Sequence, residues 1–164
     1  MEIRKVKQDD DFEAIGDVFA SSWKIAYKEI IKQSYLDNLS GSHWVATLSS
    51  LEYDTYVITE NDKYIGVSSV CSARDEKMPD WGEIKSIYLR PEYFGSGYAA
   101  QLFESVINVL LEKDLKKIYL WTFEGNKRAQ RFYEKQGFKT NGDKMPITVA
   151  EKEMIVIKYI KIFE

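Results

Sequence analysis

The chain has few of the residues used in covalent cross-links and metal sites. Its 164 residues include one cysteine, Cys71, and one histidine, His43. A single cysteine excludes an internal disulfide, and this pair provides no recognisable zinc-ligand set, so we expect no metal. Because Cys71 follows the apolar run 65–70, we interpret it as a buried strand thiol rather than a reactive one.

Long apolar runs and an excess of basic residues are also lacking. No run approaches the ~20 residues needed to span a bilayer, and the first six residues contain no apolar signal segment. We therefore expect a cytoplasmic protein with no membrane partner. The formal net charge of −3 disfavours binding to the nucleic-acid backbone, which requires a concentrated basic face, so we expect no nucleic-acid partner.

The chain is rich in residues that can form a core: 45% are hydrophobic and 14% are aromatic, which is typical of an ordered globular protein. We expect one domain over residues 1–164. Apolar periodicity and turn residues predict an α+β fold whose first four strands are largely antiparallel. The predicted strands are 3–7, 55–59, 63–71, 82–89, 117–122 and 153–162, and the predicted helices begin near 12, 35, 98 and 126.

The segment Phe94–Ala100 is suited to binding a phosphate group. Gly95 and Gly97 allow the backbone to approach a ligand closely, and an amphipathic helix pattern begins directly after them. The first N–H groups of that helix, at the positive end of its dipole, would point at the ligand.

Three other interpretations of this segment fit less well. Residues 95–100 match the pattern G-x-G-x-x-A, but five residues separate Leu89 from Gly95, and no acidic residue ends the next predicted strand, as a dinucleotide site requires. A P-loop needs lysine and a hydroxyl where Tyr98 and Ala99 stand. Ser96 lacks the flanking glycines of a nucleophile elbow.

Three blocks, Glu83–Tyr93, Gly95–Ala99 and Asn126–Phe138, resemble in order and spacing the motifs of the GCN5-related N-acetyltransferase (GNAT) superfamily. The resemblance implies a three-layer α/β/α arrangement, the acyl-CoA N-acyltransferase fold. Its central mixed, mostly antiparallel sheet has splayed strands 4 and 5. One position departs from the family pattern: Phe94 stands where that loop usually begins with glutamine or arginine, so backbone N–H groups must bind more of the diphosphate.

The same resemblance implies acetyl-CoA as cosubstrate. Its pantetheine arm would pair with the backbone of the fourth strand, and its diphosphate would lie on the loop and helix start, with Asn126 and Tyr133 contacting the arm. The cofactor-binding residues implied in this way are Ile87, Tyr88, Leu89, Phe94, Gly95, Ser96, Gly97, Tyr98, Ala99, Ala100, Asn126 and Tyr133.

Catalytic roles follow from the resemblance and from what acyl transfer requires. An ammonium group must lose a proton before it attacks, and Glu83 lies where similar enzymes place a carboxylate that works through water. We expect partial burial to raise its pKa. Tyr133 would protonate the departing thiolate, and the backbone N–H of Leu89 would donate a hydrogen bond to the oxyanion and stabilise it. A solvated Glu83 and a purely structural Tyr133 are the alternatives.

On the acceptor side, similar enzymes use the first two helices and the last hairpin, here about 22–39 and 141–152. Trp23, Tyr27 and Tyr35 are candidates for the acceptor pocket, although core packing explains Trp23 and Tyr27 as well. We expect N-acetylation of a primary amine by direct attack in a ternary complex, with a small molecule, a polyamine-like compound, or a peptide or protein as the acceptor. The alternatives are a non-catalytic acyl-CoA-binding regulatory module and a nicotinamide-linked oxidoreductase. The family also suggests a homodimer.

Overall fold

A seven-stranded sheet forms the middle layer of the protein, which is described over residues 1–164 by a computed structural model. The strand order is β1-β2-β3-β4-β5-β7-β6, and every neighbouring pair is antiparallel except β4 and β5, which are parallel. The strands are β1 (Glu2–Lys5), β2 (Asp54–Glu60), β3 (Lys63–Ser72), β4 (Trp81–Leu89), β5 (Lys117–Phe123), β6 (Lys139–Val149) and β7 (Lys152–Ile162).

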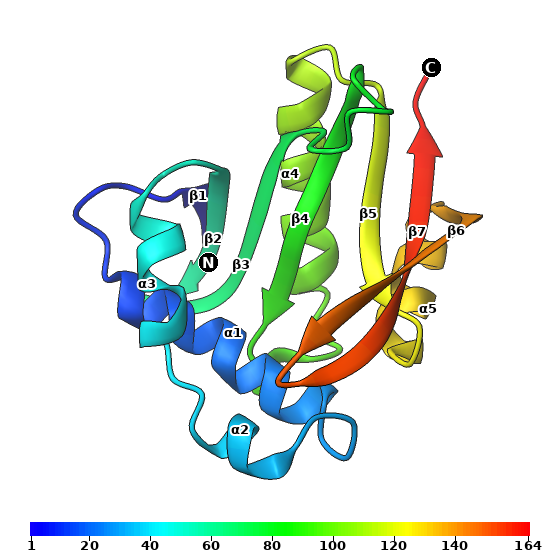
Figure 1. Ribbon diagram of the computed structural model, residues 1–164. Helices are drawn as coiled ribbons and strands as arrows, with labels where there is room; N and C mark the ends of the chain where they lie inside the picture. The colour runs from blue at the N-terminus through cyan, green and yellow to red at the C-terminus, as the bar shows by residue number, and fades with distance from the viewer.

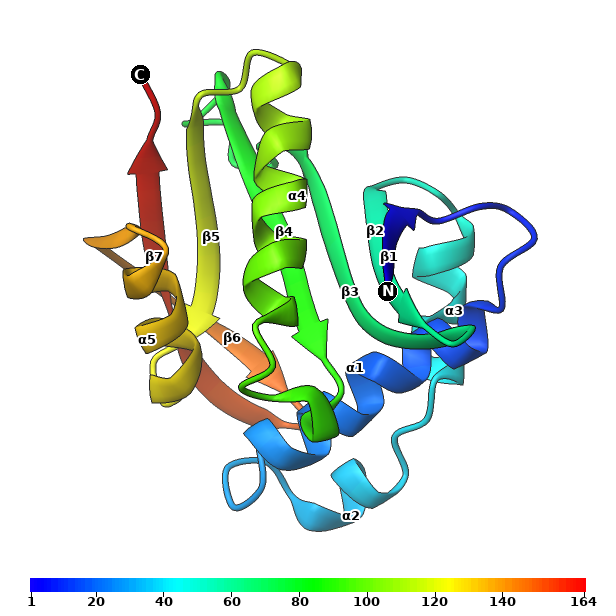
Figure 2. The ribbon, with the colours of Figure 1, turned by 180° about the vertical axis from the view of Figure 1, so that it is seen from behind.

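Helices cover both faces of this sheet. On one face lie α1 (Phe12–Ala26), α2 (Gln33–Asp37) and α3 (Ser42–Ser49), in front of the sheet in Figure 1. On the other lie α4 (Tyr98–Glu112) and α5 (Lys127–Lys135), which Figure 2 shows from behind. A single 3₁₀ turn, η1 (Pro91–Tyr93), joins β4 to α4. This arrangement confirms the predicted three-layer α/β/α fold.

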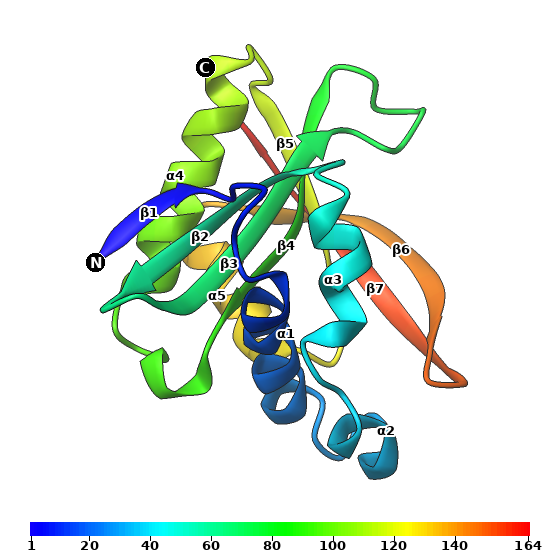
Figure 3. The same ribbon diagram turned by 90° about the vertical axis from the view of Figure 1, so that its left-hand side faces the viewer.

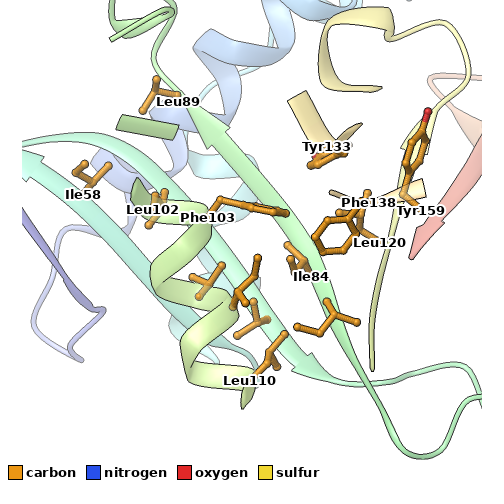
Figure 4. Packing of buried hydrophobic residues seen from close by; sticks show 14 of the residues in the cluster. Ile58, Ile84, Leu89, Leu102, Phe103, Leu110, Leu120, Tyr133, Phe138 and Tyr159 are labelled. Carbon is orange, nitrogen blue, oxygen red and sulfur yellow. The ribbon is translucent and has the colours of Figure 1, made fainter. Parts of the chain in front are cut away.

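Local signals in the sequence explain where the main helices begin and which side they bury. The carboxylate of Asp11 accepts a hydrogen bond from the N–H of Ala14 and caps α1. Helix α4 buries one apolar stripe against the sheet, and α5 adds Tyr133 to the same core (Figure 4). No helix is long and apolar enough to cross a membrane.

The structure differs from the predicted elements in two places. The helical region expected over 35–51 consists of two short helices, because the chain turns between Asn38 and Gly41. Strand β6 was absent from the element prediction, although the family resemblance implied a last hairpin there. Nine of its eleven residues are exposed, including all of 139–146, so most of the strand lacks the alternation that marks a half-buried strand.

Candidate active site

The β4–β5 ladder is short and leaves most of one edge of β4 free. Its last registered pair is Glu83 with Tyr119, whereas the two strands continue to Leu89 and Phe123. Figure 1 shows them close together at one end and well apart at the other. The splay implied by the resemblance is therefore present, and it begins at Glu83.

Backbone direction along β4 decides which groups face the gap between the strands. The N–H of Arg90 donates to the carbonyl of Ile65 in β3. Because successive residues of a strand point their backbone groups to opposite edges, Ile87 and Leu89 direct theirs away from β3, toward the gap. Tyr88 directs its backbone toward β3 instead.

The glycine loop lies between η1 and α4. Gly95 and Gly97 have φ angles of 80° and 85°, and no atom lies within 4 Å of a Cβ built on either residue. The first N–H groups of α4, at Tyr98, Ala99 and Ala100, have no acceptor within the helix geometry, although Ser96 Oγ accepts weakly from Tyr98. The loop thus has the space and the donors that fit a diphosphate.

A cationic side chain lies beside the glycine loop, although Phe94 itself carries no charge. The guanidinium of Arg128, in α5, lies 3.3 Å from the centroid of the Phe94 ring. No carboxylate forms an ion pair with Arg128; the residue is exposed. No sequence pattern predicts this contact, because Phe94 and Arg128 lie 34 positions apart in the chain.

Asn126 precedes α5, and Tyr133 lies in the last turn of that helix. Asn126 caps this helix, with its side-chain oxygen accepting from the N–H of Ala129. Tyr133 is 8% exposed, and burial, with a smaller contribution from Tyr88, raises its pKa. Its phenol is therefore fully protonated at neutral pH and can donate a proton.

Glu83 is held differently from what we expected. Its carboxylate accepts from the backbone N–H, Nε and Nη2 of Arg74 and from the hydroxyl of Tyr119, at 2.6 to 3.2 Å. Burial would raise the pKa of this group, but these hydrogen bonds outweigh it and hold the pKa below its ordinary value. The expected rise in pKa is therefore wrong.

Cys71 is half-buried rather than fully buried, and its sulfur lies 4.0 Å from a carboxylate oxygen of Glu83. Burial and that carboxylate raise the pKa of Cys71 to about 11. The thiol is protonated at neutral pH, in line with an unreactive strand cysteine.

A cavity of about 180 Å³ lies on the α1–α3 side of β4. The side view in Figure 3 shows α1 and α3 beside β3 and β4. Five aromatic residues line the cavity, together with four serine or threonine residues, one leucine and one lysine. The lining residues are Phe19, Trp23, Trp44, Thr47, Leu48, Tyr53, Thr55, Ser69, Lys85, Ser86 and Tyr88.

Of the three residues predicted for the acceptor pocket, only Trp23 lines this cavity. Tyr27 is buried in the core against Phe123, with ring centroids 4.9 Å apart. Tyr35 packs against the same cluster and does not reach the cavity. Neither Tyr27 nor Tyr35 therefore lines the cavity, and Tyr27 packs in the core, as its alternative interpretation predicted.

Trp44, Tyr53 and Lys85 line the cavity but were not predicted from the sequence. The first two come from segments without a family motif. Lys85 lies inside a motif block, but only the strand register shows its special position. Ser69 pairs with Ser86 and Val70 with Ile84, so Lys85 is the extra residue of a β-bulge.

The Acetyltransferase (GNAT) family model matches residues 14–138, and the chain therefore belongs to this family of acetyl-CoA-dependent acyltransferases. An uncharacterized N-acetyltransferase of Mycobacterium tuberculosis is 30% identical over 110 residues, 66% of this chain and 68% of that protein. A spermidine N(1)-acetyltransferase of Thermoplasma acidophilum is 24% identical over 162 residues, 93% of this chain and 97% of that protein.

The fold comparison agrees with the family match. The crystal structure of the PaiA N-acetyltransferase of Thermoplasma acidophilum, in complex with coenzyme A, superposes with a TM-score of 0.72 at 21% identity and covers 96% of each chain. Membership in a family of acyltransferases favours an enzyme over a non-catalytic module, and it removes the basis for a nicotinamide-linked oxidoreductase.

Proposed function

We propose that this protein transfers the acetyl group of acetyl-CoA to a primary amine by direct attack, with both substrates bound together. The observation that carries the proposal is the position of β4 between two binding regions. The backbone groups of Ile87 and Leu89 face the gap between β4 and β5, while the side chains of Ser86 and Tyr88 line the aromatic cavity.

Acetyl-CoA supplies an activated acetyl thioester. The N–H groups of Gly95 to Ala100 would bind its diphosphate, with Arg128 as a neighbouring cation. Ile87 and Leu89 would hold the pantetheine arm as an added strand would be held. Asn126 lies at the start of α5 where it can contact that arm.

Three residues have proposed roles in the transfer. The N–H of Leu89 points toward the gap and would stabilise the oxygen on which negative charge develops. The Tyr133 phenol would give its proton to the leaving sulfur. Glu83, ionised at the point where the strands separate, could take the amine proton through water only as a weak base, because its pKa is low.

Tyr133→Phe tests the assignment of the acid. We expect kcat to fall by about 10²-fold, the usual contribution of a general acid, with acetyl-CoA affinity nearly unchanged. Turnover is measured as release of free thiol from acetyl-CoA with a panel of primary amines, and affinity by calorimetry.

Tyr159→Phe is the matched control. This tyrosine also lies in the core near Tyr133, but its hydroxyl donates a hydrogen bond to the Glu134 carboxylate. It should keep the wild-type kcat. Equal rates for Tyr133→Phe and wild type would remove Tyr133 from the mechanism.

A further inference from the structure

Lys85 is the one charged residue among the eleven that line the aromatic cavity, and no aspartate or glutamate accompanies it. Its ammonium group lies 4.5 Å from the centroid of the Tyr53 ring. Such a contact stabilises a cation but leaves its charge uncompensated.

No carboxylate neutralises Lys85. It forms no ion pair within 4.0 Å with any acidic residue. The nearest acid along the strand, Glu83, is bound on both oxygens by Arg74. Arg74 also approaches the Tyr53 ring, at 5.9 Å, but its charge is paired with Glu83, so neither residue compensates Lys85.

A second hollow on the acceptor side has the same sign of charge. A depression of about 510 Å³ lies between the turn after α1 and the β6–β7 hairpin. Three lysines and one glutamate line it: Lys28, Lys32, Lys152 and Glu29. The local excess of positive charge contrasts with the net charge of −3 of the whole chain.

A half-buried cation without a partner favours a ligand that brings a negative charge and disfavours one that brings a second positive charge. The Ser86 hydroxyl in the same lining can donate to such a group, and so can one of the Thr55 and Ser69 hydroxyls, which share a hydrogen bond of 2.8 Å with each other. A volume of about 180 Å³ holds only a small molecule or the end of a larger one.

Resting on the acetyltransferase function proposed above, we infer that the acceptor is a small amine that also carries a carboxylate, and that Lys85 in the aromatic cavity binds that carboxylate. Polyamines, which carry only positive groups, are disfavoured.

Strand geometry sets the separation of the two groups. Lys85 precedes Leu89 by four residues, about 13 Å at ~3.3 Å per residue, and the lysine side chain spans only part of this distance. A chain of several carbon atoms between amine and carboxylate therefore fits better than the single carbon of an α-amino acid.

Three acceptors of equal length test the inference: 6-aminohexanoate, its primary amide 6-aminohexanamide, and 1,6-diaminohexane. They differ in charge at the end that would meet Lys85. We expect kcat/KM to fall in that order, with the acid at least about tenfold above the amide, as charge-assisted hydrogen bonds imply. Within the series from glycine to 6-aminohexanoate, the longer members should be better acceptors.

Lys85→Met should lower kcat/KM for the acid about tenfold and leave the amide within about threefold. Lys85→Glu should reverse the order and make the diamine the best of the three. The matched control is Lys161→Met, a lysine in β7 whose ammonium lies 4.7 Å from the Phe163 ring, outside both cavities. It should change none of the three values.

The inference is overturned if the amide or diamine equals the acid with the wild-type enzyme, or if Lys85→Met lowers all three values equally. It is also overturned if acetyl-CoA is bound and other amines are acetylated but the amino acids are not. Failure to bind acetyl-CoA, measured separately by calorimetry, would count against the proposed function itself.

Discussion

Glu83 is the residue whose environment most changes its expected chemistry. Four donors from Arg74 and Tyr119 surround its carboxylate, and they lower the pKa that burial alone would raise. A carboxylate with a lowered pKa stays ionised above its ordinary value of 4.5. It stabilises the folded state above that pH, and this stabilisation is lost as the pH falls below it.

This lowering predicts the pH dependence of catalysis. Between pH 5.5 and 8 we expect no acid limb in kcat/KM caused by Glu83, because the group is already ionised throughout. Glu83→Gln should change the level of the profile but not the position of its limbs. Removing the guanidinium with Arg74→Met should raise the pKa of Glu83 and introduce a new acid limb.

The measurement is kcat/KM against pH for the wild type and both variants. A wild-type limb with an apparent pKa of 6 to 8 that disappears in Glu83→Gln would show instead that Glu83 titrates as an ordinary poised base.

Residues inside motifs were easier to predict from sequence than residues brought in from elsewhere. Gly95, Gly97 and Asn126 could be placed because their spacing reflects a local backbone requirement. Arg128 beside Phe94 and Lys85 in the cavity could not be predicted, since the first depends on a contact between distant segments and the second on a shift in strand register.

At the scale of elements, the close contact between α1 and α3 shapes the acceptor side. A Cβ on Gly16 would overlap the carbonyl group of Gly41, the residue that precedes α3. The N–H of Gly41 also donates to the Asp17 carboxylate at 2.8 Å. These two helices supply Phe19, Trp23, Trp44, Thr47 and Leu48 to the cavity.

Gly16→Ala should therefore destabilise the protein by about 1 to 3 kcal/mol, because it forces α3 away from α1. The sign is informative, since glycine to alanine inside a helix normally stabilises by about 1 kcal/mol. The measurement is the free energy of unfolding in urea. Gly125→Ala is the control: its Cβ would meet only Ile30, at 3.8 Å, and stability should hardly change. A stabilised Gly16→Ala variant would contradict the close helix contact.

Elements with a strong apolar period were predicted closely: both ends of β3 and β4 within one residue, and the starts of α1 and α4. Those without such a period were not. Strand β6 is held by its pairing with β7, and α2 and α3 by packing onto α1 and the cluster around Leu36. Tertiary contacts rather than local pattern determine these segments.

At the scale of the whole molecule, the sheet separates two binding regions of different character. The glycine loop and the starts of α4 and α5 offer N–H donors and Arg128 on one side (Figure 2), and the aromatic cavity lies on the other. The net charge of −3 describes neither region, because each has one cation without an ion-pair partner, Arg128 in the first and Lys85 in the second.

Ligand binding to the first region should appear as a change in global stability. At about 100 times its Kd, acetyl-CoA should add about 2.7 kcal/mol, which raises Tm by roughly 5 to 10 °C in a protein of this size. NAD at the same concentration should give no shift.

If Arg128 contacts the diphosphate, Arg128→Met should show a smaller shift with acetyl-CoA than wild type, because one cation near the diphosphate is lost. Arg131→Met, an exposed arginine of the same helix, should keep the full shift. Equal shifts for both variants would mean that Arg128 only stacks on Phe94 and that backbone donors hold the diphosphate alone.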